Sequence, residues 1–132
     1  MSPGAANYLC IAAGSALGGV LRYWLSGVLA QRFGETFPVG TLVVNVTGSF
    51  LIGFLFTFTG TEGRVLWSAT MRNFFLAGIC GGYTTFSSFS LQTLSLAREG
   101  EWLFAGLNIL LSVALCLVAV WLGHALAQTI NR

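Results

Sequence analysis

The sequence predicts an all-α membrane protein with four transmembrane helices, the third of them broken near its middle. Hydrophobic residues make up 55% of the 132 residues and charged residues only 8%, against roughly 25% in soluble domains. Four apolar segments follow one another, and each is long enough to cross a hydrocarbon core of ~30 Å. No linker separates them, so residues 1–132 are expected to form a single domain.

Short segments with turn-forming residues separate the expected spans. The spans are Tyr8 to Leu29, Val39 to Phe58, Met71 to Ala97 and Trp102 to Leu126. Pro38 lies just before the second span, where proline suits a first helical turn. The first, second and fourth spans carry small or polar residues at helical spacing, and small residues let helices approach closely in a membrane. Close packing is therefore the expected role of Gly14, Gly18, Gly48 and Gly53.

The third segment is too long for one straight span, and it contains three glycines followed by a run of hydroxyl side chains. We expect its helix to be interrupted around Gly81 and Gly82. Irregular backbone at membrane depth is tolerated only where protein buries it or where it lines a polar pathway. Carbonyls freed at such a break suit monovalent cations, and the next half-helix begins with its positive end. A polar species is therefore expected to pass or bind here.

Several uncharged side chains are candidates for the wall of that pathway. An amide in mid-span is costly without partners, so Asn45 is either a functional donor or an interhelical hydrogen bond that locks packing. Phe86 and Phe89 share a helix face, although core packing is the usual role of phenylalanine. The hydroxyl side chains after the predicted break are Thr84, Thr85, Ser87, Ser88 and Ser90.

The predicted membrane interior lacks carboxylates and contains uncharged donors, and this favours a pathway for an anion. The acidic residues Glu35, Glu62, Glu99 and Glu101 all fall in or beside loops. Amide and hydroxyl donors, with the positive edges of aromatic rings, can replace an anion's water and still release the anion. A small proton- or sodium-coupled multidrug exporter is the alternative, but such exporters rely on a carboxylate inside the membrane. The net charge is +2, the chain contains no lysine and its arginines form no large cluster, so nucleic-acid binding is not expected.

The arginines predict no clear orientation in the membrane. With four spans, Arg64, Arg72 and Arg132 belong to the side of both termini, and Arg22, Arg32 and Arg98 to the other side. Orientation follows the asymmetry of lysine and arginine between loops, and here that asymmetry is almost absent. Two opposite copies can then pair about an axis in the membrane plane, unless a small difference favours one orientation.

Three blocks of the sequence resemble the Fluc (CrcB) family of bacterial fluoride channels, and the resemblance covers essentially the whole chain. The blocks are GGVLRY from Gly18 to Tyr23, GTLVVNVTGS from Gly40 to Ser49, and GGYTTFSSFS from Gly81 to Ser90. The resemblance implies a dual-topology, antiparallel homodimer of four-helix subunits in the bacterial inner membrane. It also implies two pores per dimer that let fluoride leave the cell passively, without catalysis or proton coupling.

The same resemblance implies roles for individual residues. The pore is expected to be lined by Asn45, Phe86 and Phe89, by a polar track of Thr85, Ser87, Ser88 and Ser90, and by Ser112 in the fourth span. The backbone carbonyls of Gly81 and Thr84 match those that hold a structural sodium ion on the dimer axis. Arg22 matches an arginine near the vestibule, which would gather anions. Gln92 replaces a glutamate of many relatives, and Asn108 a tyrosine of some, so the resemblance assigns neither residue a role and leaves the lining by the fourth helix open. A membrane assembly subunit, in which these polar residues only pack, remains a further alternative.

Overall fold

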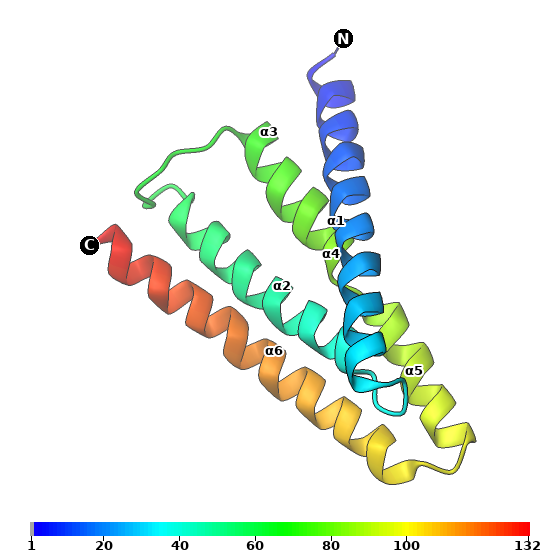
Figure 1. Ribbon diagram of the computed structural model, residues 1–132. Helices are drawn as coiled ribbons and strands as arrows, with labels where there is room; N and C mark the ends of the chain where they lie inside the picture. Colours follow the sequence, from blue (N-terminus) through cyan, green and yellow to red (C-terminus); the bar gives the residue numbers. More distant parts are fainter. Residues whose placement is uncertain (1) are drawn as a thin grey trace.

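The computed structural model describes residues 2–132, and the regular elements in that range are all helices (Figure 1). They are α1 (Pro3–Phe33), α2 (Val39–Phe58), α3 (Ala69–Arg72), the π-helical segment η1 (Asn73–Cys80), α4 (Gly81–Tyr83), α5 (Phe86–Arg98) and α6 (Trp102–Asn131). Among these, α1, α2 and α6 are long and apolar enough to cross a membrane. The structure therefore confirms the all-helical fold, and three of its helices, at the positions of the first, second and fourth expected spans, fit a membrane protein by length and composition.

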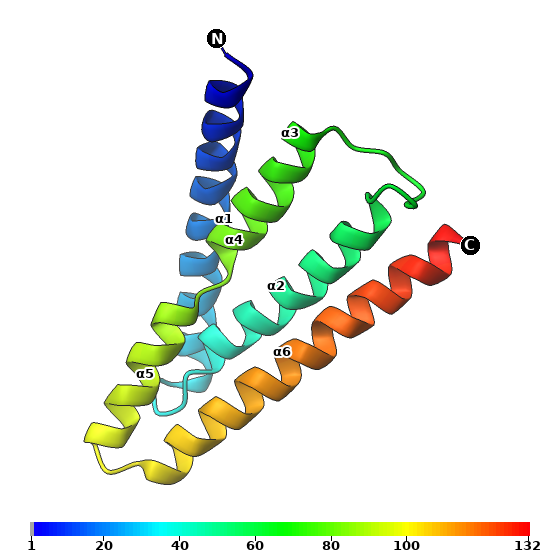
Figure 2. The same ribbon diagram turned by 180° about the vertical axis from the view of Figure 1, so that it is seen from behind.

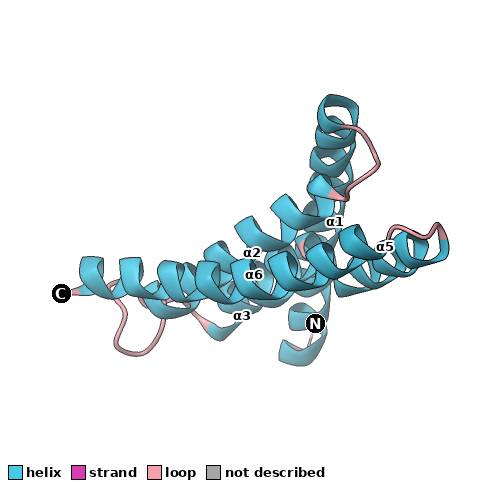
Figure 3. Cartoon of the chain, turned by 90° about the horizontal axis from the view of Figure 1, so that it is seen from below, coloured by secondary structure: helices cyan, strands magenta, loops and turns pink. Residues whose placement is uncertain are grey.

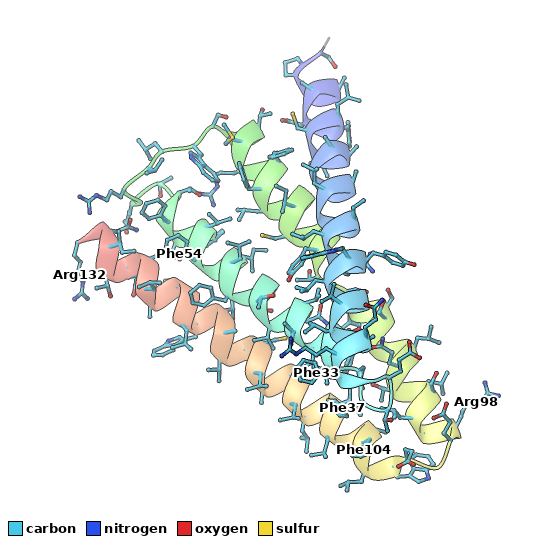
Figure 4. All side chains as sticks on the ribbon, in the orientation of Figure 1. Phe33, Phe37, Phe54, Arg98, Phe104 and Arg132 are labelled. Carbon is cyan, nitrogen blue, oxygen red and sulfur yellow. The ribbon has the colours of Figure 1, made fainter. Side chains whose placement is uncertain are left out.

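The helices run back and forth between two ends of the molecule. Both termini and the connection between α2 and α3 lie at one end, and the connections before α2 and after α5 lie at the other (Figures 1 and 2). Helices α2 and α6 lie side by side over most of their length, and α1 crosses them at a steep angle (Figure 3). Arg98 and Arg132 lie at opposite ends (Figure 4), so positive charge is present at both.

Glycine allows the helices to touch backbone to backbone along two seams. In the first seam, a Cβ atom added to Gly78 of η1 would lie only 3.0 Å from the Cα atom of Gly14 in α1. In the second, a Cβ atom added to Gly53 of α2 or Gly123 of α6 would collide with the backbone of the other helix. Gly14, Gly18, Gly48 and Gly53 are all buried against neighbouring helices, as predicted.

The helix between Ala69 and Arg98 is interrupted, but three residues later than the sequence predicts. Gly81 and Gly82 remain helical in α4, and the extended residues are Thr84 and Thr85. Glycine permits a break without enforcing one, and here Gly82 serves packing, because its added Cβ atom would lie 2.8 Å from the Cα atom of Ser15 in α1. The location around Gly81 and Gly82 was therefore wrong.

The threonines themselves stabilise the two helix ends at the interruption. Both the N–H and the hydroxyl of Thr84 donate to the carbonyl of Cys80, at 3.0 and 2.9 Å. The hydroxyl of Thr85 accepts the N–H of Ser88 at 3.1 Å, which is the hydrogen bond of a helix N-cap. Side-chain hydrogen bonds of this kind compete with helix continuation, so the pair Thr84 and Thr85 ends one helix and starts the next.

Candidate functional site

Asn45 of α2 forms hydrogen bonds with the backbone N–H and carbonyl that the helix interruption leaves without helical partners. Its Nδ2 donates to the carbonyl of Thr85 at 2.9 Å, and its Oδ1 accepts the N–H of Thr85 at 2.7 Å. One side-chain amide thus satisfies both polar groups of the same extended residue. The Asn45 amide carries two Nδ2 hydrogens, and one of them is left for another acceptor. Of the two alternatives for Asn45, the hydrogen bond between helical segments is present, and it leaves one amide hydrogen without a partner in the described chain.

A cavity of about 310 Å³ adjoins this contact, between α2, α5 and α6. It is lined by Asn45 and Ser49 of α2, by Thr84 and Thr85, by Phe86 and Phe89 of α5, and by Ser112, Val113, Cys116 and Leu117 of α6. Of the residues expected to line a pore, the structure brings Asn45, Thr85, Phe86, Phe89 and Ser112 together here. Ser49 was not among the predicted residues. Its position four residues after Asn45 on the same helix face was the signal that could have identified it.

The two phenylalanines contribute differently to the cavity. The side chain of Phe89 is 8% exposed and belongs to the core, whereas that of Phe86 is 76% exposed. Their ring centroids lie 5.2 Å apart with the planes at 48°. Phe89 thus forms a fixed wall between α5 and its neighbours, and Phe86 presents its ring to the surroundings of the single chain.

The serines at the start of α5 form a hydroxyl cluster beside the cavity. Thr85 Oγ1 lies 3.3 Å from Ser87 Oγ and donates to Ser88 Oγ at 3.1 Å, and Ser90 Oγ donates to the carbonyl of Phe86 at 2.9 Å. Ser87, Ser88 and Ser90 do not line the 310 Å³ cavity, and Ser87 and Ser90 are exposed. The predicted polar track therefore divides into Thr85 at the cavity and three serines outside it.

A second set of polar side chains connects α5 to α6 behind Ser112. Asn108 and Ser112 are 2% and 7% exposed. Asn108 Nδ2 donates to Thr93 Oγ1 at 2.9 Å, Thr93 Oγ1 donates to the carbonyl of Phe89 at 2.8 Å, and Ser112 Oγ donates to Asn108 Oδ1 at 3.3 Å. Sequence reasoning gave no role to Thr93 or Asn108.

Arg22 of α1, expected near a vestibule, contacts α4, and the carbonyls of Gly81 and Thr84, expected to hold an ion, belong to the first residue of α4 and to the residue that follows α4. Arg22 Nε donates to the carbonyl of Gly82 at 3.2 Å, so the guanidinium stabilises the last turn before the interruption. Among the described residues, no hydrogen bond reaches the carbonyls of Gly81 and Thr84. Arg22 is absent from the lining of the 310 Å³ cavity.

Two larger hollows lie at the two ends of the helices. One of about 860 Å³ is lined by residues that include Arg72, Arg132 and Glu62, and one of about 580 Å³ by residues that include Glu35 and Glu99. The acidic side chains of the described chain therefore lie near the ends, as predicted, and none lines the 310 Å³ cavity. The described residues also contain no cluster of His, Cys, Asp and Glu suited to a metal ion.

Comparison with known proteins gives matches over nearly the whole chain. The family model described as CrcB-like protein, Camphor Resistance (CrcB), matches residues 9–124. A fluoride-specific ion channel FluC of Paramagnetospirillum magneticum is 61% identical over 126 residues, which cover 96% of this chain and 98% of that protein. The proteins of the same name from Rhodospirillum rubrum and Opitutus terrae are 59% and 62% identical and cover 96% and 94% of this chain, and 98% and 94% of their own lengths.

Proposed function

The chain belongs to the CrcB family, and we propose that it is a fluoride-specific ion channel that lets fluoride leave a bacterial cell passively through the inner membrane. The observation that carries this proposal is the identity of about 60% with proteins named fluoride-specific ion channel, over 94–96% of the chain. A channel needs no catalytic step and no coupling ion.

The 310 Å³ cavity supports the proposal because its polar groups are uncharged. Asn45 retains one amide hydrogen after bonding to Thr85, and the side-chain hydroxyl of Ser49 has no hydrogen-bond partner within the described chain. Neutral donors of this kind can replace part of a fluoride ion's hydration, and they hold it weakly enough to release it. A carboxylate at this depth would repel the anion, and the nearest ones lie at the ends of the helices.

The working channel is an antiparallel homodimer with two pores, its subunits inserted in opposite orientations. The ring of Phe86 is exposed on the single chain, beside a cavity that is lined by α2, α5, α6 and the interruption at Thr84 and Thr85, and a second subunit would complete the wall. Arginine at both ends of the molecule gives neither end a strong preference for the cytoplasm. The segment from Ala69 to Arg98 is the remaining transmembrane span, interrupted at Thr84 and Thr85.

A structural sodium ion between the subunits fits the backbone at the interruption. The carbonyl oxygens of Gly81 and Thr84 accept no hydrogen bond within the described chain, and hard cations bind such oxygens. Two carbonyls from each of two subunits would provide four ligands. Bound there, sodium would neutralise carbonyl dipoles that otherwise lie unpaired at membrane depth.

Flux measurements on purified protein in liposomes test the proposal. With a potassium gradient and valinomycin to set the potential, a fluoride electrode should record rapid fluoride efflux, and a chloride electrode no efflux above that of empty liposomes. Equal chloride flux, or flux that requires a proton gradient, would exclude a fluoride-specific passive channel. Replacing sodium by N-methylglucamine on both sides during purification and assay should lower the thermal stability of the dimer, and unchanged stability would contradict the sodium site.

A further inference from the structure

The hydrogen bonds behind Ser112 have only one possible direction. The carbonyl of Phe89 is purely an acceptor, so the single hydroxyl hydrogen of Thr93 is committed to it at 2.8 Å. The oxygen of Thr93 can then only accept from Asn108, at 2.9 Å, which requires the Nδ2 side of the amide to face Thr93. The orientation of the Asn108 amide is thus fixed by a backbone carbonyl on another helix.

The fixed amide in turn determines what Ser112 can do. With Nδ2 turned toward Thr93, the Oδ1 atom of Asn108 faces Ser112, and an amide oxygen cannot donate. In its hydrogen bond with Asn108, across 3.3 Å, Ser112 can therefore only be the donor, and the bond uses its only hydroxyl hydrogen. Its oxygen lone pairs are what remains for the 310 Å³ cavity that it lines, and lone pairs repel an anion.

We propose that Thr93 and Asn108 are positioning residues that make Asn108 compete with the permeating anion for the hydroxyl hydrogen of Ser112. An anion in the cavity gains the Ser112 donor only when this hydrogen turns away from Asn108 Oδ1. Asn108 is 2% exposed, so no water replaces the lost donor, and an unsatisfied buried amide oxygen is costly. The competition weakens anion binding beside Ser112 and so favours release. This inference rests on the proposed channel function.

Removing the competing acceptor is the direct test. In Asn108→Leu, a side chain of similar size replaces the amide, and the hydroxyl hydrogen of Ser112 is free to turn to the anion. The fluoride concentration for half-maximal flux should fall about fivefold, which corresponds to about 1 kcal/mol, a typical net hydrogen bond. In the background of Ser112→Ala the same substitution should leave that concentration unchanged, because Asn108 acts only through the Ser112 hydroxyl.

Substitutions at Thr93 provide a second test that does not alter Asn108. Thr93→Val keeps the shape but no longer fixes the amide, so the half-saturating concentration should fall, whereas Thr93→Ser should preserve the wild-type value. The matched control is Thr129→Val, since Thr129 Oγ1 also donates to a carbonyl four residues earlier, at 3.0 Å, but is exposed at the far end of α6. Equal half-saturating concentrations in wild type, Thr93→Val and Asn108→Leu would overturn the proposal. It would also be overturned if Asn108→Leu lowered the half-saturating concentration as much in the Ser112→Ala background as in the wild-type background.

A spectrum of the side-chain amides separates failure of this inference from failure of the channel function. In protein labelled with 15N at asparagine, the buried Asn108 amide should exchange slowly with solvent, and its signals should shift in Thr93→Val but not in Thr93→Ser. If wild-type protein carried no fluoride, the channel function would be wrong, and the proposed competition between Asn108 and fluoride would be wrong with it. If fluoride flux is normal but the Asn108 amide signals do not shift in Thr93→Val, the positioning role is wrong and the channel function stands.

Discussion

Replacing Asn45 by aspartate changes the charge of the cavity without changing the size of the side chain. Aspartate can still accept the N–H of Thr85, now 2.7 Å from Oδ1. It cannot donate to the carbonyl of Thr85, so two oxygens would face each other where Nδ2 and the carbonyl oxygen now lie 2.9 Å apart. The second amide hydrogen, which faces no protein acceptor, is lost as well. The substitution thus turns the main free donor of the cavity into a negative charge.

The electrostatic cost alone is large. Two like charges about 4 Å apart repel by about 4 kcal/mol at an effective dielectric constant of about 20. Every 1.4 kcal/mol corresponds to about a tenfold change, so this repulsion opposes fluoride passage by a factor of about 10³. Partial relaxation around the carboxylate reduces the effect, and we expect fluoride flux through Asn45→Asp to fall at least about a hundredfold.

The chain offers a closely matched control for this experiment. Asn131 at the end of α6 makes the same two kinds of hydrogen bond, but with two different residues. Its Nδ2 donates to the carbonyl of Thr57 at 3.2 Å, and its Oδ1 accepts the N–H of Arg64 at 2.9 Å. It lies at the molecular end rather than at the cavity, where salt screens charges beyond about 8 Å. Flux through Asn131→Asp should stay within about twofold of wild type.

The assay is fluoride efflux from liposomes at matched protein density, with gel filtration to show that each variant elutes as the wild-type oligomer. Asn45→Leu separates loss of the hydrogen bonds from the added charge, and it should retain more flux than Asn45→Asp. Flux through Asn45→Asp equal to that of wild type would show that fluoride does not pass Asn45, and the proposed pathway would then be wrong.

Three further substitutions test other parts of the structure. Phe86→Ile should reduce fluoride flux about tenfold or more while leaving the oligomer intact, because Phe86 is 76% exposed and adds little to the core of the chain; normal flux would remove its ring from the pathway. Gly123→Ala should cost about 1–3 kcal/mol by forcing α2 and α6 apart, seen as a lower melting temperature in detergent, whereas Gly106→Ala on the same helix meets nothing within 4 Å and should be neutral; equal melting temperatures would contradict the seam. Arg22→Ala should also lower the melting temperature, because the carbonyl of Gly82 loses a charged donor, and an unchanged value would leave Arg22 only a role in attracting anions.

Hydropathy predicts the long helices well because it depends on composition alone. The predicted second span coincides with α2, Val39–Phe58, and the fourth begins at Trp102 as predicted. The first and fourth helices extend beyond the predicted ends, to Pro3–Phe33 and Asn131, since polar residues at the ends of a helix are compatible with helical backbone. Hydropathy predicts which residues suit the hydrocarbon core, whereas a helix can continue beyond those residues, so the ends of a helix do not follow from hydropathy.

The position of the interruption shows what a sequence pattern lacks. Two adjacent glycines indicate where a helix can bend, but Gly82 is required for contact with α1, and the helix continues through it. The interruption falls at Thr85 instead, where the decisive partner, Asn45, lies 40 residues earlier in the chain. Local propensity does not predict hydrogen bonds between residues that are 40 positions apart in the sequence. The same limit explains why the hydrogen bonds of Thr93 and Asn108 could not be predicted from the sequence.

An amide at position 45 reconciles the two interpretations that the sequence left open. An extended residue at membrane depth exposes one N–H and one carbonyl, and each needs a partner because no lipid group supplies one. A side chain that donates and accepts at once satisfies both, and among side chains of this length only asparagine does so and keeps a further hydrogen. Serine lacks the extra hydrogen, and aspartate lacks any donor when ionised. The structural bond and the donor for a passing anion are thus properties of one functional group, so no substitution at Asn45 removes one without disturbing the other.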